Sequence, residues 1–277
     1  MSFALARFAR AFHPATRRFA SSLASKPASH SSRVLLWGTA ALGMTAGCLV
    51  LSPTTIYLDS QVTKTLVQQN AGEDTIVDPA TSIAFPKVMR VPSKIKVPPL
   101  TLVGVGVRKV SFMRVKVYSI AFYADLNNPN LVIPRDMSPE DKIEHIIRNS
   151  ACVIRIVPTR STSYTHLRDA FVRALQARLA AAMREGTITE ETTQAASSSM
   201  RSLKSLFPNA PLAKHSPLDI FLAAPIPNRT RPVVFRDLGS IECDWLATEF
   251  FLNYFDKDGP SPPLKESVFE SIREFST

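Results

Sequence analysis

A strand-like segment near the middle of the chain carries residue types that could hold an anion. In LVGVGVRKV, residues 102–110, alternation places Gly104, Gly106 and Arg108 on one face and three valines on the other. Glycine weakens a strand and often marks close approach by a ligand or by another backbone. An arginine at the end of this bare face presents a planar fork of donors that suits a carboxylate or an enolate oxygen. The alternative, an ion-paired surface arginine that ends the strand, stays open at this point.

Other residues that do chemistry lack the spacing of a known site. His145, His166 and His215 are the histidines beyond the N-terminal segment, and none has HxxxH or Cys/His spacing. The three cysteines are scattered, without the spacing of metal ligands. The GxG pattern of Gly104 and Gly106 lacks the third glycine and the following helix of a dinucleotide-binding site. The sequence therefore predicts no metal site, and only His166, near the start of a predicted helix, is kept as a candidate haem ligand.

The positive charge of the chain is concentrated at its N-terminus. The formal charge is +10, but residues 1–58 hold six basic residues and no acid. The remainder has 27 basic residues against 23 acidic ones, so the basic composition is poor evidence for nucleic-acid binding. Residues 1–33 are rich in Arg, Ser and Ala, which is typical of a mitochondrial transit peptide, although a disordered basic tail is the alternative.

An uncharged apolar segment follows, from Val34 to Leu51. Its length of about 27 Å as a helix is enough to cross a thin bilayer, so we predict one transmembrane helix, with a buried soluble helix as the alternative. Lys26 and Arg33 precede the segment and Asp59 follows it. The positive flank should face the matrix, which places the rest of the chain in the intermembrane space at the mitochondrial inner membrane.

The elements that must position Arg108 lie in one predicted domain. Residues 52–96 are interpreted as a linker and residues 97–277 as the domain. Apolar periodicity and capping residues predict helices over 138–149, 163–186, 187–206, 241–255 and 261–275, the third with Thr187 and Glu190 as a capping box. Strands are predicted at 102–124, 151–158, 218–224 and 232–238. This order indicates an α+β fold with helices packed on one face of a mainly antiparallel sheet.

The predicted hairpin VGVGVRKVSFMRVKVYSIAFYAD and the final segment IECDWLATEFFLNYFD…SPPLK resemble the chalcone isomerase superfamily. The presequence, the apolar segment and the linker resemble the fungal branch named for altered inheritance of mitochondria. The resemblance implies an open-faced β-sandwich whose large antiparallel sheet is covered by helices, with a cleft between the two. It also implies that the glycines leave room for a ligand and that Arg108 holds its anionic end.

The resemblance also transfers the catalytic and binding positions of chalcone isomerases to this chain. Arg108 matches the arginine, and Tyr164 matches the tyrosine that polarises the carbonyl. The family's threonine falls at Tyr118, its asparagine at Phe171, and its final Thr/Ser at Asn253. Three of the five positions therefore depart from the enzymes, and loss of a polar contact weakens substrate recognition strongly.

Three functional hypotheses follow. Lys116 and Tyr118 resemble the non-catalytic, fatty-acid-binding relatives, which favours a membrane-anchored binder of an apolar carboxylate ligand, a fatty acid or haem. Haem is the leading cofactor expectation because fungal relatives are associated with it. An intramolecular lyase acting on a conjugated ketone is the alternative, supported by Arg108 and Tyr164. A structural factor in inner-membrane organisation or inheritance, associating through Gly43 and Gly47, is the third.

Overall fold

The computed structural model describes residues 74–93, 97–110 and 113–277. The described residues all belong to one compact unit. The predicted transit peptide, residues 1–33, and the predicted membrane span, Val34–Leu51, lie outside the described residues. Within the described ranges, no helix is long and apolar enough to cross a bilayer.

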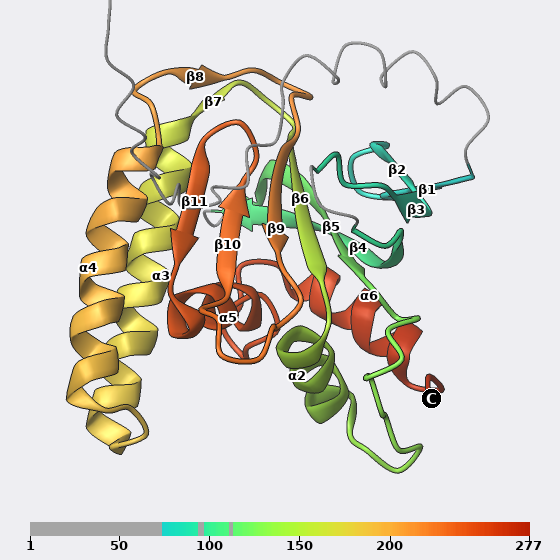
Figure 1. Cartoon of the computed structure of the whole chain (residues 1–277). Coiled ribbons are helices and arrows are strands. Elements are labelled where there is room, and N and C mark those ends of the chain that lie inside the picture. Colours follow the sequence, from blue (N-terminus) through green and yellow to red (C-terminus); the bar gives the residue numbers. More distant parts are fainter. Residues whose placement is uncertain (1–73, 94–96, 111–112) are drawn as a thin grey trace, which may run out of the picture. The chain divides into compact units, whose positions relative to one another are not determined.

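The central element is an antiparallel sheet, which in the described part of the chain has seven strands (Figure 1). Their order across the sheet is β11-β10-β9-β6-β5-β4-β3, and every neighbouring pair is antiparallel. This confirms the predicted α+β class with a large antiparallel sheet. The strands are β3 (Val88–Met89), β4 (Leu100–Val110), β5 (Val115–Ala124), β6 (Cys152–Pro158), β9 (Leu218–Leu222), β10 (Pro232–Phe235) and β11 (Gly239–Glu242).

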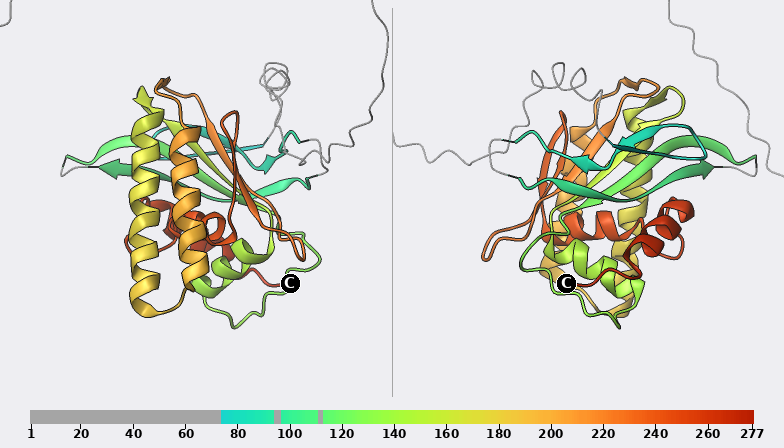
Figure 2. Two further views of the ribbon diagram at one scale, coloured as in Figure 1. Left: turned by 60° about the vertical axis from the view of Figure 1, so that its left-hand side comes forward. Right: turned by 90° about the vertical axis from the view of Figure 1, so that its right-hand side faces the viewer.

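The described helices contribute to one hydrophobic cluster with one face of this sheet. Strands β4, β5, β6 and β9 supply Val103, Ile120, Ile154 and Ile220, and all the helices add apolar side chains. Figure 2 shows α3 and α4 side by side, and α2, α5 and α6 on the same side of the sheet. The helices are α2 (Pro139–Asn149), α3 (Tyr164–Glu185), α4 (Glu190–Leu206), α5 (Asp244–Leu252) and α6 (Pro262–Ile272), and the short pair β7 (Thr162–Ser163) and β8 (Pro211–Leu212) adjoins them.

Capping residues explain where the helices begin and end. Ser138 accepts a hydrogen bond from the Asp141 amide at the start of α2, as predicted. Gly186 ends α3 with a φ of 67°, a left-handed conformation that glycine adopts without steric cost. The predicted capping box at Thr187 is wrong. Thr189 caps α4 instead, because the Thr187 hydroxyl donates to the Ala182 carbonyl (3.3 Å) at the end of the preceding helix.

The opposite face of the sheet is covered in part by residues before Val97. A hairpin of β1 (Thr75–Val77) and β2 (Ala84–Pro86) lies there, and β3 joins the sheet edge beside β4. Phe85 and Met89 are buried in a second cluster with Tyr123 and Phe221. The expectation of a linker over 52–96 is therefore wrong for residues 74–93, because their apolar side chains complete this second core.

A buried carboxylate attaches the hairpin to the sheet. Asp78, in the turn between β1 and β2, accepts hydrogen bonds from the Ser119 hydroxyl (2.5 Å) and the Thr81 hydroxyl (2.7 Å). Ser119 lies on β5 and is fully buried. A buried charge is stable only when its hydrogen bonds are satisfied, so this contact specifies how the hairpin docks.

Candidate functional site

Arg108 lies near the end of β4, directly opposite Tyr118 on β5. Its guanidinium carbon is 5.9 Å from the centroid of the Tyr118 ring, within the range of a cation–π contact. The side chain is half-buried on the face of the sheet that carries the helices. Within the described residues, no carboxylate lies at ion-pair distance from Arg108. The alternative of an ion-paired surface arginine therefore loses its support.

Two buried tyrosines complete the surroundings of Arg108. Tyr118 is 3% exposed, and Tyr254, in the segment after α5, is 1% exposed. Their hydroxyl groups share a hydrogen bond, and Tyr118 is also hydrogen-bonded to Arg108. We call Arg108, Tyr118 and Tyr254 the Arg–Tyr cluster. It brings together three polar groups from β4, β5 and the end of α5.

Burial keeps both phenols of the cluster protonated. It raises the pKa of Tyr118, and the positive charge of Arg108 offsets this rise only in part. For Tyr254, burial and then the neighbouring Tyr118 hold the pKa well above its ordinary value of 10.0. At neutral pH the cluster therefore holds one cation and two protonated hydroxyl groups that share one hydrogen bond. This set of groups suits an anionic oxygen and leaves little tendency to supply a phenolate.

Tyr254 was not among the predicted site residues, because the resemblance pointed to its neighbour Asn253. Asn253 is half-buried at the C-terminal cap of α5, where its amide donates to the Glu249 carbonyl (3.0 Å). A signal for Tyr254 was present in the sequence. Ala247, Phe250 and Tyr254 follow each other at helical spacing on an apolar stripe, and a tyrosine on such a stripe usually places its hydroxyl against a polar partner.

The two glycines of β4 make room for α6. A Cβ atom at Gly106 would lie 2.3 Å from the Leu264 amide nitrogen and 2.7 Å from the Leu264 Cα. At Gly104 it would lie 2.8 Å from the Val268 amide nitrogen. Any side chain at either position would therefore collide with the main chain of α6. The bare face of the strand is a helix-packing surface.

Hydrogen bonds hold α6 against this face. The Ser261 hydroxyl donates to the Val107 carbonyl (3.0 Å), and the Val105 amide donates to the Ser267 hydroxyl (3.2 Å). The expectation that Gly104 and Gly106 open onto ligand space is thus corrected. The space that the glycines leave is filled by a helix whose contacts are specific.

Tyr164 and Phe171 both lie on α3 and pack against aromatic rings. Tyr164 is the first residue of α3, and its ring packs against Phe207 (6.4 Å between centroids). Partial burial, and then the negative charge of Asp237, raise the pKa of Tyr164. The Phe171 ring is buried against Phe207 and Phe250 (6.0 and 5.0 Å). Arg108 thus contacts Tyr118 of the neighbouring strand, whereas the Tyr164 ring contacts Phe207.

Comparison with known proteins agrees with this architecture. The sequence profile described as "Chalcone isomerase like" matches residues 98–133 and 133–269. The chain belongs to the chalcone isomerase-like family. A solved structure, the Arabidopsis thaliana fatty-acid binding protein AtFAP1, is similar with a TM-score of 0.53 and 19% identity, covering 73% of this chain and 100% of that one. At this identity the likeness supports the fold alone.

A relative known from sequence covers a smaller region. An uncharacterised protein of Schizosaccharomyces pombe is 32% identical over 98 residues, which is 29% of this chain and 38% of that protein. The match therefore spans less than half of each chain. The resemblance to the chalcone isomerase superfamily that the hairpin residues indicate is confirmed by the family profile and by the similar fold.

Two further predicted site residues, Lys116 and His166, lie on the surface of this chalcone isomerase-like chain. Lys116 is exposed, and its ammonium group donates to the Ala80 carbonyl (2.5 Å) in the β1–β2 turn. His166 is exposed on the first turn of α3, where its amide donates to the Ser163 hydroxyl (3.1 Å). Among the described residues, no group of three or more His, Cys, Asp or Glu side chains is arranged to hold a metal ion.

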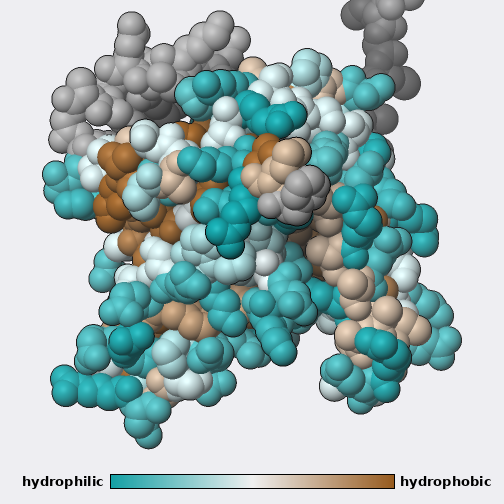
Figure 3. Space-filling view, turned by 180° about the vertical axis from the view of Figure 1, so that it is seen from behind, coloured by the Kyte–Doolittle hydropathy of each residue, from teal (hydrophilic) through white to brown (hydrophobic). Residues whose placement is uncertain are grey.

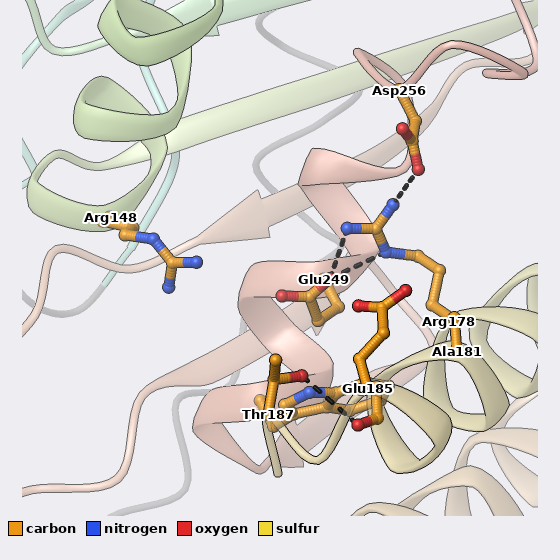
Figure 4. Close-up of a pocket in the computed structure, with 9 residues that line it drawn as sticks. Arg148, Arg178, Ala181, Glu185, Thr187, Glu249 and Asp256 are labelled. Carbon is orange, nitrogen blue, oxygen red and sulfur yellow. Dashed lines mark hydrogen bonds and ion pairs between the residues drawn. The ribbon is translucent and has the colours of Figure 1, made fainter.

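A cavity of about 460 Å³ lies away from the Arg–Tyr cluster, between α3, α5 and the end of α2 (Figure 4). Arg178 projects into it and pairs with Glu249 and Asp256. Arg148, on the opposite wall, pairs with Glu144 (2.7 Å). Because Arg178 of α3 pairs with Glu249 of α5 and with Asp256, we interpret the cavity as a polar junction that ties α3 to α5.

The buried tyrosines predict a loss of stability in alkali. A phenol whose pKa is raised by folding stabilises the native state fully below its unfolded pKa of about 10, and this stability is lost as the pH rises through the folded pKa. We therefore expect the free energy of unfolding to fall above pH 10. Replacement of Tyr254 by Phe should make this fall shallower while costing about 1 kcal/mol at pH 7. Urea unfolding at a series of pH values measures both effects. If the free energy of unfolding fell equally steeply above pH 10 in the variant and the parent, the raised pKa of Tyr254 would be contradicted.

Proposed function

We propose that this chalcone isomerase-like domain is a non-catalytic binder of an apolar molecule that carries a carboxylate. The Arg–Tyr cluster is the site for the carboxylate. The observation that carries the proposal is that Arg108 is half-buried, has no carboxylate partner within the described residues, and adjoins two protonated phenols. A partly desolvated cation without a counter-ion is a costly arrangement, which an anionic ligand would relieve.

The chemistry of the cluster matches a carboxylate closely. A guanidinium can donate two parallel hydrogen bonds to the two carboxylate oxygens, and such charge-assisted bonds are about twice as strong as neutral ones. The Tyr118 hydroxyl, already bonded to Arg108, is placed to donate to the same ligand group after exchanging its partner. A second carboxylate-binding residue is therefore available from the neighbouring strand.

The apolar part of the ligand would lie beside the cluster, where aromatic side chains now fill the interior. Phe122, on the same face of β5 as Tyr118, packs edge to face against Phe255, which follows Tyr254 (5.0 Å between centroids). Phe255 belongs to the irregular segment between α5 and α6. In this proposal, displacement of this segment admits a hydrocarbon chain next to Arg108.

A fatty acid suits the cluster better than haem does. Both carry carboxylates, but haem iron also needs an axial ligand, usually His, Cys, Met or Tyr. The phenols of the cluster hold their protons, and His166 is exposed on α3. The name of AtFAP1 as a fatty-acid binding protein adds support from a protein of the same fold.

The lyase alternative has less support from the geometry. It needs Arg108 and Tyr164 to act on one substrate, and Tyr164 packs instead against Phe207 under the influence of Asp237. The mitochondrial address, the membrane anchor at Val34–Leu51 and the intermembrane-space location remain predictions from the N-terminal sequence. Protease protection and alkaline extraction of isolated mitochondria would test them.

Direct titration tests the proposal. A fragment of residues 53–277, which contains the compact unit, is titrated with four ligands. They are oleic acid, methyl oleate as the matched ligand that lacks the carboxylate, haemin, and a hydroxychalcone. We expect binding of oleic acid and much weaker binding of methyl oleate. A Soret shift with haemin would instead favour haem, and cyclisation of the chalcone above the spontaneous rate would favour the lyase. Binding of none of the four would contradict the proposal.

A further inference from the structure

The hairpin that connects β4 to β5 extends beyond the rest of the domain. In both panels of Figure 2 the adjoining ends of β4 and β5 project past the helices and the neighbouring strands. Two apolar side chains are exposed there, Met113 (67% exposed) and Val110 (36%). Figure 3 looks toward this end of the hairpin and shows apolar surface set among hydrophilic surface. Exposed apolar side chains at a projecting point are typical of a surface that meets a partner or a membrane.

Basic residues surround these apolar side chains. Lys109 flanks Val110 on β4, while Arg114 and Lys116 follow Met113. The loop after β6 adds Arg160, because Thr159 bonds to the Val117 and Lys116 carbonyls (3.1 and 2.8 Å). Residues 97–124 contain no acid.

These basic residues are also free of acidic partners. Lys109, Arg114, Lys116 and Arg160 have no ion pair with any described residue. We call Lys109, Val110, Met113, Arg114, Lys116 and Arg160 the basic tip. Its net charge at pH 7 is therefore positive and uncompensated nearby.

We infer that the basic tip docks on the surface of an anionic phospholipid bilayer. Met113 and Val110 would enter the interface between head groups and acyl chains, while the lysines and arginines remain at the level of the phosphates. Each basic side chain close to an anionic membrane surface strengthens binding by roughly fivefold. The apolar centre of the tip distinguishes this surface from a nucleic-acid site, where phosphate contacts dominate.

Docking through the basic tip would place the Arg–Tyr cluster close to the membrane surface, because Arg108 directly precedes Lys109 on β4. The inference does not depend on the proposed function. Arg108 is half-buried and is not part of the basic tip, so Arg108→Ala should weaken fatty-acid binding strongly while docking is retained. Failure of one property can thus be told apart from failure of the other.

Lipid quenching of a tryptophan at the tip tests the inference. The full chain with Met113→Trp is reconstituted in vesicles of phosphatidylcholine alone, or of equal parts phosphatidylcholine and phosphatidylserine, each with brominated acyl chains. Emission of the parent chain is subtracted to remove the contributions of Trp37 and Trp245. Met183→Trp, at a similarly exposed methionine on α3 (55%), is the matched control.

We expect the emission of the Met113→Trp variant to be quenched and blue-shifted in the anionic vesicles. The equilibrium constant for docking should be at least about tenfold larger in anionic than in neutral vesicles. The emission of the Met183→Trp control should stay unquenched. Addition of Lys109→Glu and Arg114→Glu to Met113→Trp should remove the quenching.

Two results would overturn the inference. The first is that anionic vesicles do not quench the emission of the Met113→Trp variant, or that neutral and anionic vesicles quench it equally. The second is an emission shift that follows protein concentration without lipid, which would indicate a second copy of the chain as the partner.

Discussion

Arg108→Ala is expected to lower the affinity for oleic acid by roughly 30- to 4,000-fold, which corresponds to about 2–5 kcal/mol. The variant removes a charge-assisted pair and leaves the carboxylate of the ligand without a counter-ion in a partly desolvated site. Arg108→Lys should restore only part of the affinity, because an ammonium group lacks the planar fork that binds both carboxylate oxygens. Isothermal titration of the compact unit measures all three affinities.

Stability measured on the same preparations separates a binding role from a structural one. Arg108 has no ion pair with any described residue, so its loss should change the melting temperature only slightly. Arg201→Ala, at an exposed position of α4, is the control for removal of a positive charge and should bind oleic acid like the parent. A marked drop in melting temperature with unchanged oleic acid affinity would refute the assignment of Arg108 as the carboxylate site.

Gly106→Ala is expected to destabilise the domain by about 3 kcal/mol and to lower its melting temperature by roughly 6–12 °C. The added methyl group would lie 2.3 Å from the Leu264 amide nitrogen, so α6 must move away from β4. This movement would also stretch the hydrogen bond from Ser261 to the Val107 carbonyl. Thermal unfolding followed by circular dichroism measures the effect.

Gly186→Ala provides the matched control for the loss of a glycine. Gly186 has a left-handed φ of 67° but open space around its Cβ position, so its replacement carries backbone strain without collision. We expect a loss of about 1 kcal/mol, several-fold less than at Gly106. If Gly106→Ala instead preserved the melting temperature and weakened oleic acid binding, the glycine face would be part of the ligand site, as the sequence first suggested.

Local sequence patterns were sufficient for much of the fold. Alternation along residues 102–124 predicted the β4–β5 hairpin, and the facing of Arg108 and Tyr118 follows from the pairing of the two strands. Ser138 and Gly186 marked helix boundaries because capping depends on residues adjacent in the chain. Patterns failed for residues 74–93, whose strands are only two or three residues long and show no measurable periodicity.

Tertiary structure decided what occupies the space beside Gly104 and Gly106. The spacing of Gly104 and Gly106 shows that their face must be bare, but not whether a ligand or a helix occupies it. The occupant, α6, follows β4 by more than 150 residues, and its position depends on the packing of the whole helix layer.

The same distinction applies to the residues around Arg108. Sequence alone indicated an α+β domain whose first long strand carries an arginine near its end, and the structure placed Tyr118 opposite that arginine. It could not choose between Asn253 and Tyr254, because consecutive helical residues point about 100° apart and the rotation of α5 against the sheet selects which one faces β5. Nor could it show that the Tyr164 ring packs against Phe207, since that contact depends on where the start of α3 packs. Side-chain type and spacing follow from the sequence, whereas the meeting of distant side chains follows from how the layers pack.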